Sequence, residues 1–124
     1  MKTEVTEIQE TLKDIMREHL GPLRIRHDNE RNFEVCGTFE TMQGKQKVDG
    51  YYFASIMPKP KDVRLYFFPV YTHVDNYGPL PEKLNKALKG KSCFHIKKLD
   101  EELEGQIREM VAKGIELYKK DGLI

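Results

Sequence analysis

The sequence predicts an α+β fold: a mainly antiparallel sheet of about five strands, with N- and C-terminal helices packed on one face. Two observations support this fold. Apolar residues near both ends of the chain recur every three or four positions, which is the period of a helix, and much of the chain between them alternates with the period of a half-buried strand. The expected order α-β-β-β-β-α-β-α needs no parallel crossover before the last strand, which favours antiparallel pairing.

The composition is that of one globular domain spanning residues 1–124. The chain is 39% hydrophobic and 33% charged, with a net charge of +1, which argues against a nucleic-acid or acidic membrane partner. It lacks an N-terminal apolar run and any long apolar stretch, so we expect a soluble cytoplasmic protein. Cys36 and Cys93 are then expected to be free thiols.

The first third of the chain predicts one helix and two strands. Residues 3–20 carry apolar side chains with helical spacing, and Gly21 and Pro22 end that helix. Residues 23–28 and 33–40 follow as strands. The buried stripe of the helix is expected to contain Val5, Ile8, Leu12, Ile15, Met16 and Leu20. The buried face of the second strand is expected to contain Phe33, Val35 and Phe39.

The middle of the chain predicts a hairpin. Residues 47–57 and 63–71 are expected as strands joined by the proline-containing connection 58–62, because proline denies a donor to the strand ladder. Residues 72–80 are expected as a loop.

The last part predicts a helix over residues 81–88, a fifth strand over 91–97 and a final helix over 101–119, which Asp100 caps. Gly105 and Gly114 inside the last helix are unfavourable there. We therefore expect both to pack closely against the sheet.

A family resemblance follows from two segments. One segment is LYFFP (residues 65–69), and the other is KGKSCFHIKKLD (residues 89–100), which an amphipathic helix follows. With these segments the chain resembles the YdhG-like family over about residues 48–119. The resemblance implies an α+β domain. Some members of that family are described as frataxin-like iron chaperones, and the resemblance transfers no catalytic residues.

The first candidate site is an aromatic face of the hairpin. Strict alternation places Tyr52, Ala54 and Ile56 on one face of their strand. On the next strand, Val63, Leu65 and Phe67 are expected to meet the helices, which leaves Arg64, Tyr66 and Phe68 on the other side. Arg64 could hold a carboxylate or phosphate while the rings stack on an apolar body. A loop or a second subunit covering this face is the alternative.

The second candidate is an acidic stripe on the first helix, formed by Glu4, Glu7, Glu10, Asp14 and Glu18. Glu4, Glu7, Asp14 and Glu18 have the spacing of one helix face, with Glu10 at its margin. Carboxylates are ligands suited to ferrous iron. The alternative is a solvated helix face, partly neutralised by Lys13 and Arg17.

Other polar residues give weaker patterns. His73 with Asp75, and His27 with Asp28, are acid/base candidates or simple turn residues. The lysines between Lys83 and Lys98 could bind a phosphate or only solubilise an edge. No nucleophile, zinc-ligand or other catalytic motif occurs, so an enzyme is the less favoured class.

Together these patterns favour an intracellular binding module with no cofactor, either a monomer or a homodimer. We expect its ligand, an unidentified small molecule or protein, at Tyr52, Arg64, Tyr66, Phe68 and His73. The alternative function is a frataxin-like iron-binding protein that uses the acidic first helix.

Overall fold

One antiparallel sheet organises the fold, as shown by a computed structural model that describes residues 1–124. Its six strands are β1 (Leu23–Asp28), β2 (Phe33–Gly37), β5 (Tyr52–Pro58), β6 (Val63–Phe67), β7 (Leu88–Lys89) and β8 (Cys93–Ile96). They lie in the order β1-β2-β5-β6-β8-β7, and each neighbouring pair is antiparallel. A separate hairpin joins β3 (Thr41–Gln43) to β4 (Gln46–Val48).

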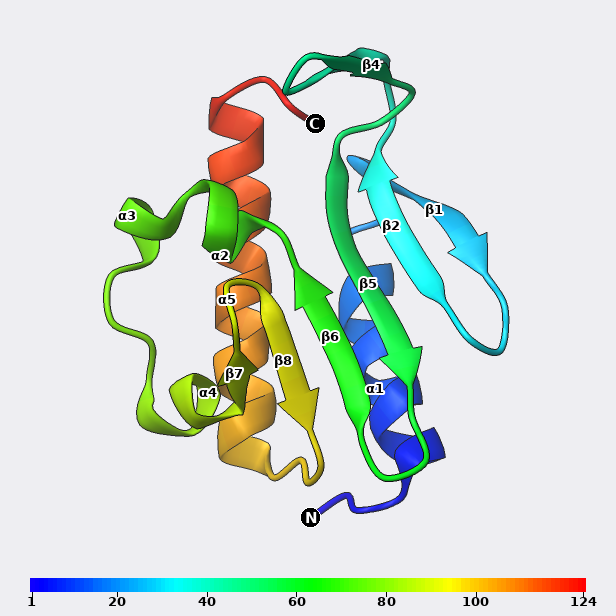
Figure 1. Cartoon of the computed structure of the whole chain (residues 1–124), viewed down its shortest axis with the longest axis vertical. Helices are drawn as coiled ribbons and strands as arrows, with labels where there is room; N and C mark the ends of the chain where they lie inside the picture. Colours follow the sequence, from blue (N-terminus) through cyan, green and yellow to red (C-terminus); the bar gives the residue numbers. More distant parts are fainter.

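The two long helices cover one face of this sheet. Figure 1 shows α1 (Val5–Arg17) and α5 (Glu101–Lys120) behind the strands, which confirms the predicted α+β architecture. Three short helices lie beside the sheet between β6 and β7: α2 (Pro69–Thr72), α3 (Val74–Tyr77) and α4 (Glu82–Ala87). No helix has the length and hydropathy that a bilayer-spanning segment needs.

The core lies between the sheet and the two long helices. Burial alternates along β6, so Val63, Leu65 and Phe67 meet the helices as predicted. The final helix begins as expected, because the Asp100 side chain accepts a hydrogen bond of 2.8 Å from the Leu103 amide. The helices contribute to this core mainly Ile8, Leu12, Ile15, Ile107, Val111 and Ile115.

A bulge in β5 places Tyr52 on the opposite face of the strand from Ala54 and Ile56. Val35 pairs with Ala54 and Cys36 pairs with Tyr52, so Phe53 is an extra residue between the two pairs. Phe53 and Ala54 are both buried, and Phe53 packs against Phe67 on the helix side. The expectation that Tyr52 shares a face with Ala54 and Ile56 is therefore wrong. Tyr52 lies on the open face of the sheet, the face expected for the aromatic site, where its hydroxyl donates to Ser55 Oγ. Ala54 and Ile56 lie on the helix side, in the core.

Several predicted strands are too long. The strand expected over residues 33–40 ends at Gly37, and Phe39 is 43% exposed instead of buried. The strand expected over 47–57 is divided at Gly50, which crosses so close to Gly37 that a Cβ there would lie 2.2 Å from the Gly37 carbonyl oxygen. Leu20 lies beyond the end of α1 and is 42% exposed, so its predicted place in the buried stripe is wrong.

Close packing explains Gly114 but not Gly105. A Cβ at Gly114 would lie 2.7 Å from Phe67 Cζ and 3.0 Å from the Tyr77 hydroxyl. A Cβ at Gly105 would meet no atom within 4 Å, so the close packing expected at that position is wrong.

The two glycines therefore predict opposite effects of alanine on stability. Gly114→Ala should lower the free energy of unfolding by about 1–3 kcal/mol, because the added methyl group overpacks the core. Gly105→Ala should raise it by about 0.5–1 kcal/mol, because alanine favours the helical backbone. Urea unfolding followed by circular dichroism measures both changes. Equal stabilisation by the two substitutions would contradict the packing at Gly114.

Candidate functional site

An aromatic row runs along the open face of the sheet towards its edge. The rings of Tyr52 and Phe68 lie 5.4 Å apart, and those of Phe68 and Tyr71 lie 5.7 Å apart. Tyr71, in α2, is 47% exposed. Tyr52, Phe68 and Tyr71, called the aromatic row below, thus connect the centre of the sheet to the short helices beside it.

Tyr66 is linked to this row through Ser55. Ser55 lies opposite Tyr66 in the sheet and accepts a 2.7 Å hydrogen bond from the Tyr52 hydroxyl. Burial raises the pKa of Tyr52 to about 12, so its hydroxyl stays protonated and can donate. The structure therefore brings together three of the predicted ligand-binding residues, Tyr52, Tyr66 and Phe68.

Arg64 and His73 have partners elsewhere. Arg64 Nε donates to Asp62 Oδ1 at 2.9 Å. His73 Nε2 lies 2.6 Å from Asp121 Oδ2, and its Nδ1 lies 2.8 Å from the Thr72 hydroxyl. Both ring nitrogens are engaged, so His73 does not pair with Asp75 as the sequence suggested.

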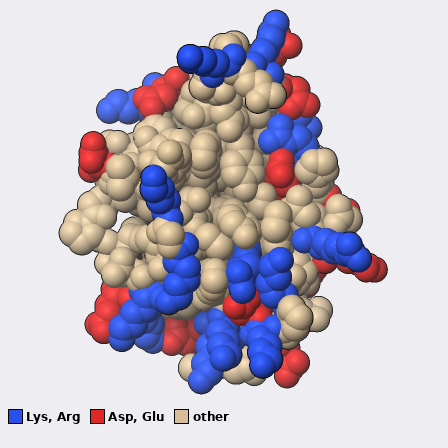
Figure 2. All heavy atoms as spheres, in the orientation of Figure 1, with Lys and Arg blue, Asp and Glu red and all other residues tan.

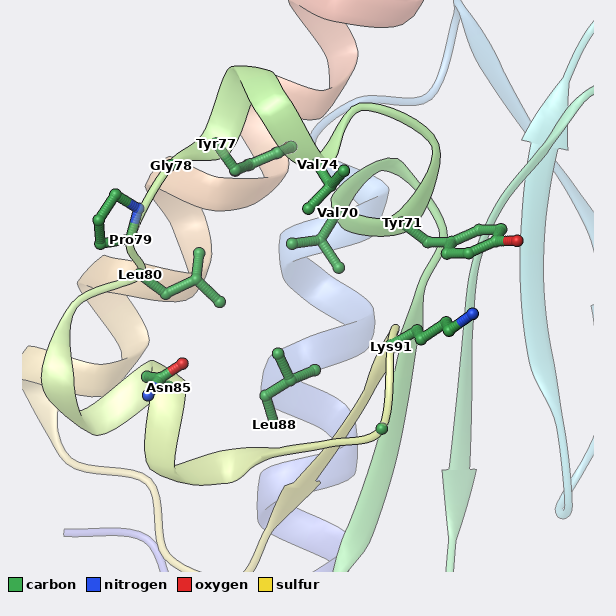
Figure 3. Close-up of a pocket in the computed structure, with 11 residues that line it drawn as sticks. Val70, Tyr71, Val74, Tyr77, Gly78, Pro79, Leu80, Asn85, Leu88 and Lys91 are labelled. Carbon is green, nitrogen blue, oxygen red and sulfur yellow. The ribbon is translucent and has the colours of Figure 1, made fainter.

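A pocket of about 480 Å³ opens at the far end of the aromatic row. Val70, Val74, Leu80 and Leu88 form its apolar wall, and Figure 3 shows these four side chains directed into the same space. The remaining lining residues are Tyr71, Tyr77, Gly78, Pro79, Asn85, Gly90 and Lys91. The surface is hollowed in the same region, on the left of Figure 2.

Hydrogen bonds and close contacts hold the pocket wall in place. The Tyr77 hydroxyl donates to the Met110 carbonyl oxygen of α5 at 2.8 Å. The Phe68 carbonyl oxygen accepts from the Tyr71 amide at 2.9 Å, at the point where β6 turns into α2. Because Pro69 cannot donate to the sheet ladder, the chain leaves the sheet here and forms the wall.

None of the five predicted ligand-binding residues lines this pocket. The prediction of a strand over residues 63–71 is wrong, because β6 ends at Phe67 and α2 begins at Pro69. A strand of that length would keep Val70 and Tyr71 in the sheet, so it does not predict the pocket. Pro69 inside a predicted strand, followed by Val70, Tyr71 and Val74, was the available signal for an apolar segment outside the sheet.

On the open face, charged side chains lie mainly at the margins and at one end. Figure 2 shows a broad uncharged area in its upper half, with charged groups at its margins and at its lower end. Two of the lysines between Lys83 and Lys98 are paired with acids: Lys83 with Asp100 and Glu102, and Lys86 with Glu82.

The acidic side chains of α1 are largely paired as well. Glu10 and Asp14 both bind Arg17, and Glu18 binds Arg108 of α5. No group of three His, Cys, Asp or Glu side chains comes together in the geometry of a metal site. Iron binding by α1 therefore stays a sequence-based prediction.

The two cysteines are free, as expected. Burial raises the pKa of the Cys36 and Cys93 thiols. Since the thiolate is the nucleophilic form of cysteine, neither environment activates its sulfur at neutral pH.

Comparisons with known proteins give no relative. No family model matches the chain, and neither the curated proteins nor the solved structures include a significant match. The resemblance to the YdhG-like family consequently stays a prediction from the two segments that suggested it.

The buried tyrosines predict loss of stability in alkaline solution. Burial raises the pKa of Tyr52 to about 12 and also raises the pKa of Tyr77 and Tyr118. The unfolded chain ionises tyrosine near pH 10, so it loses these protons first. The stability that the neutral tyrosines contribute is therefore complete below about pH 10 and is lost as the pH rises towards about 12.

Urea unfolding between pH 8 and pH 11.5 measures this decline, and Tyr52→Phe should make it shallower. Tyrosine absorbance at 295 nm gives an independent check. Titration of all six tyrosines together near pH 10 in the folded protein would contradict the assignment.

Proposed function

We propose that this protein is a small binding module that holds a small organic ligand in the pocket between α2, α3, α4 and the β7–β8 turn. The observation that carries the proposal is the pocket itself. Its volume of about 480 Å³ and its predominantly apolar wall with few polar groups are typical of small-molecule sites.

The pocket is preformed, which supports this function. Tyr77 is anchored to α5, and Val70 is nearly fully buried beneath the pocket. A wall that is already held in place costs little conformational entropy when a ligand binds. The apolar side chains that remain exposed at its mouth, Val74 and Tyr71, lose contact with water when the pocket is filled.

The aromatic row supplies a second surface for the same ligand. Tyr71 belongs both to the row and to the pocket, so a ligand longer than the pocket would extend onto Phe68 and Tyr52. The proposed site is therefore centred on the pocket and the aromatic row, and no longer on Arg64, Tyr66 and His73. Those three residues lie outside the pocket lining.

Location, family and oligomeric state are further proposals. The free, unactivated thiols suit the reducing cytoplasm, and we propose that location. Membership of the YdhG-like family and a monomeric or homodimeric state are likewise proposals.

Filling the pocket with a large side chain tests the function. Val74 is 59% exposed at the pocket mouth, so Val74→Trp should fold normally and occupy the apolar space. We expect a library of small organic fragments, screened by ¹H–¹⁵N correlation spectra, to shift the amides of Val74, Leu88 and Lys91 in the wild-type protein. The same fragments should shift these amides at least tenfold more weakly in Val74→Trp.

Met42→Trp is the matched control, because Met42 is 54% exposed and lies in the β3–β4 hairpin, away from the pocket. It should bind the fragments as the wild type does. Fragments that bind Val74→Trp as tightly as the wild type, or that shift only the amides of β5 and β6, would disprove the proposed site.

A further inference from the structure

The charge of the pocket lining is one-sided. Among the eleven lining residues Lys91 carries the only formal charge, and no aspartate or glutamate is present. Asn85 adds a neutral amide. A ligand with a negative charge therefore meets one complementary group and no repulsive one, whereas a cationic ligand meets only repulsion.

Lys91 has no carboxylate partner, unlike Lys83 and Lys86 of α4. Lys83 binds Asp100 and Glu102, and Lys86 binds Glu82 at 3.0 Å. Lys91 Nζ instead lies 5.5 Å from the centre of the Tyr71 ring. This cation–π contact holds the ammonium group beside the Tyr71 ring, at the edge of the pocket, without neutralising its charge.

Lys91 lies at one side of the pocket, so the charged part of the lining is separate from the apolar interior. Lys91 lies in the turn between β7 and β8, and Figure 3 shows its side chain running beside Tyr71, with the ammonium group directed away from the apolar side chains of the pocket. Val70, Val74, Leu80 and Leu88 line the interior. A ligand would fit with its apolar body inside and its charged end at the mouth, where the charge keeps part of its hydration.

We infer that the ligand of this pocket is an amphipathic organic carboxylate, whose apolar body fills the space among Val70, Val74, Leu80 and Leu88 and whose carboxylate pairs with Lys91. The inference rests on the proposed function and specifies the chemical class of its ligand. Tyr71 orients the lysine and covers the part of the ligand next to the carboxylate.

Three eight-carbon probes test the charge preference: octanoate, 1-octanol and octylammonium. Their dissociation constants are measured from the amide shifts of Leu88 and Lys91 in ¹H–¹⁵N spectra at low ionic strength. We expect octanoate to bind about three- to fivefold more tightly than octanol, as befits a partly exposed ion pair, and octylammonium to bind more weakly than octanol.

Lys91→Met keeps the apolar stem of the side chain and removes the charge. In this variant octanoate should lose its advantage, while the affinity for octanol should stay within a factor of two. Lys89→Met is the control, because Lys89 is an exposed lysine of β7 outside the pocket lining and its replacement makes the same change in net charge. It should keep the preference for octanoate.

The outcomes separate the inference from the proposed function. Equal binding of octanoate and octanol in the wild type, or an octanoate preference that survives Lys91→Met, would overturn the pairing of the carboxylate with Lys91 but leave the pocket as a binding site. If none of the three probes shifts the pocket amides, both the inference and the proposed function fail.

Discussion

The close contact at Gly114 is the constraint on which the rest of the structure depends. With no side chain there, α5 approaches the end of β6 so closely that Phe67, Pro69 and Tyr77 all lie against one backbone position. Tyr77 adds a hydrogen bond to the Met110 carbonyl oxygen of the same helix. The chain that leaves the sheet after β6 is thereby held against α5, and that chain forms the wall of the pocket.

Two interruptions of regular structure then create the candidate site. Pro69 ends the ladder of β6 and diverts the chain into α2, α3 and α4 before it returns as β7. The bulge at Phe53 turns Tyr52 onto the open face, where its ring meets Phe68. Because Phe68 also contacts Tyr71, the open face and the pocket share one continuous aromatic surface. Lys91 is the single charged residue of the pocket lining, and it lies beside Tyr71 at the pocket end of this aromatic surface.

Local periodicity was sufficient to predict the fold but not the site. The alternation of Val63, Leu65 and Phe67 and the cap at Asp100 depend on neighbouring residues alone, so both could be read from the sequence. The bulge at Phe53 inserts one residue into an otherwise regular strand and leaves no mark in composition. Gly105 and Gly114 look alike in sequence and differ only in what lies opposite them. The meeting of Tyr71 and Lys91 depends on the path of the chain between them, which periodicity does not describe.

A crystal structure of the protein grown with saturating octanoate tests the central claim most directly, because it shows where an amphipathic carboxylate lies. The account predicts an alkyl chain among Val70, Val74, Leu80 and Leu88, with the carboxylate within ion-pair distance of Lys91 Nζ. An empty pocket under these conditions, or octanoate bound only on the sheet at Tyr52 and Tyr66, would contradict it.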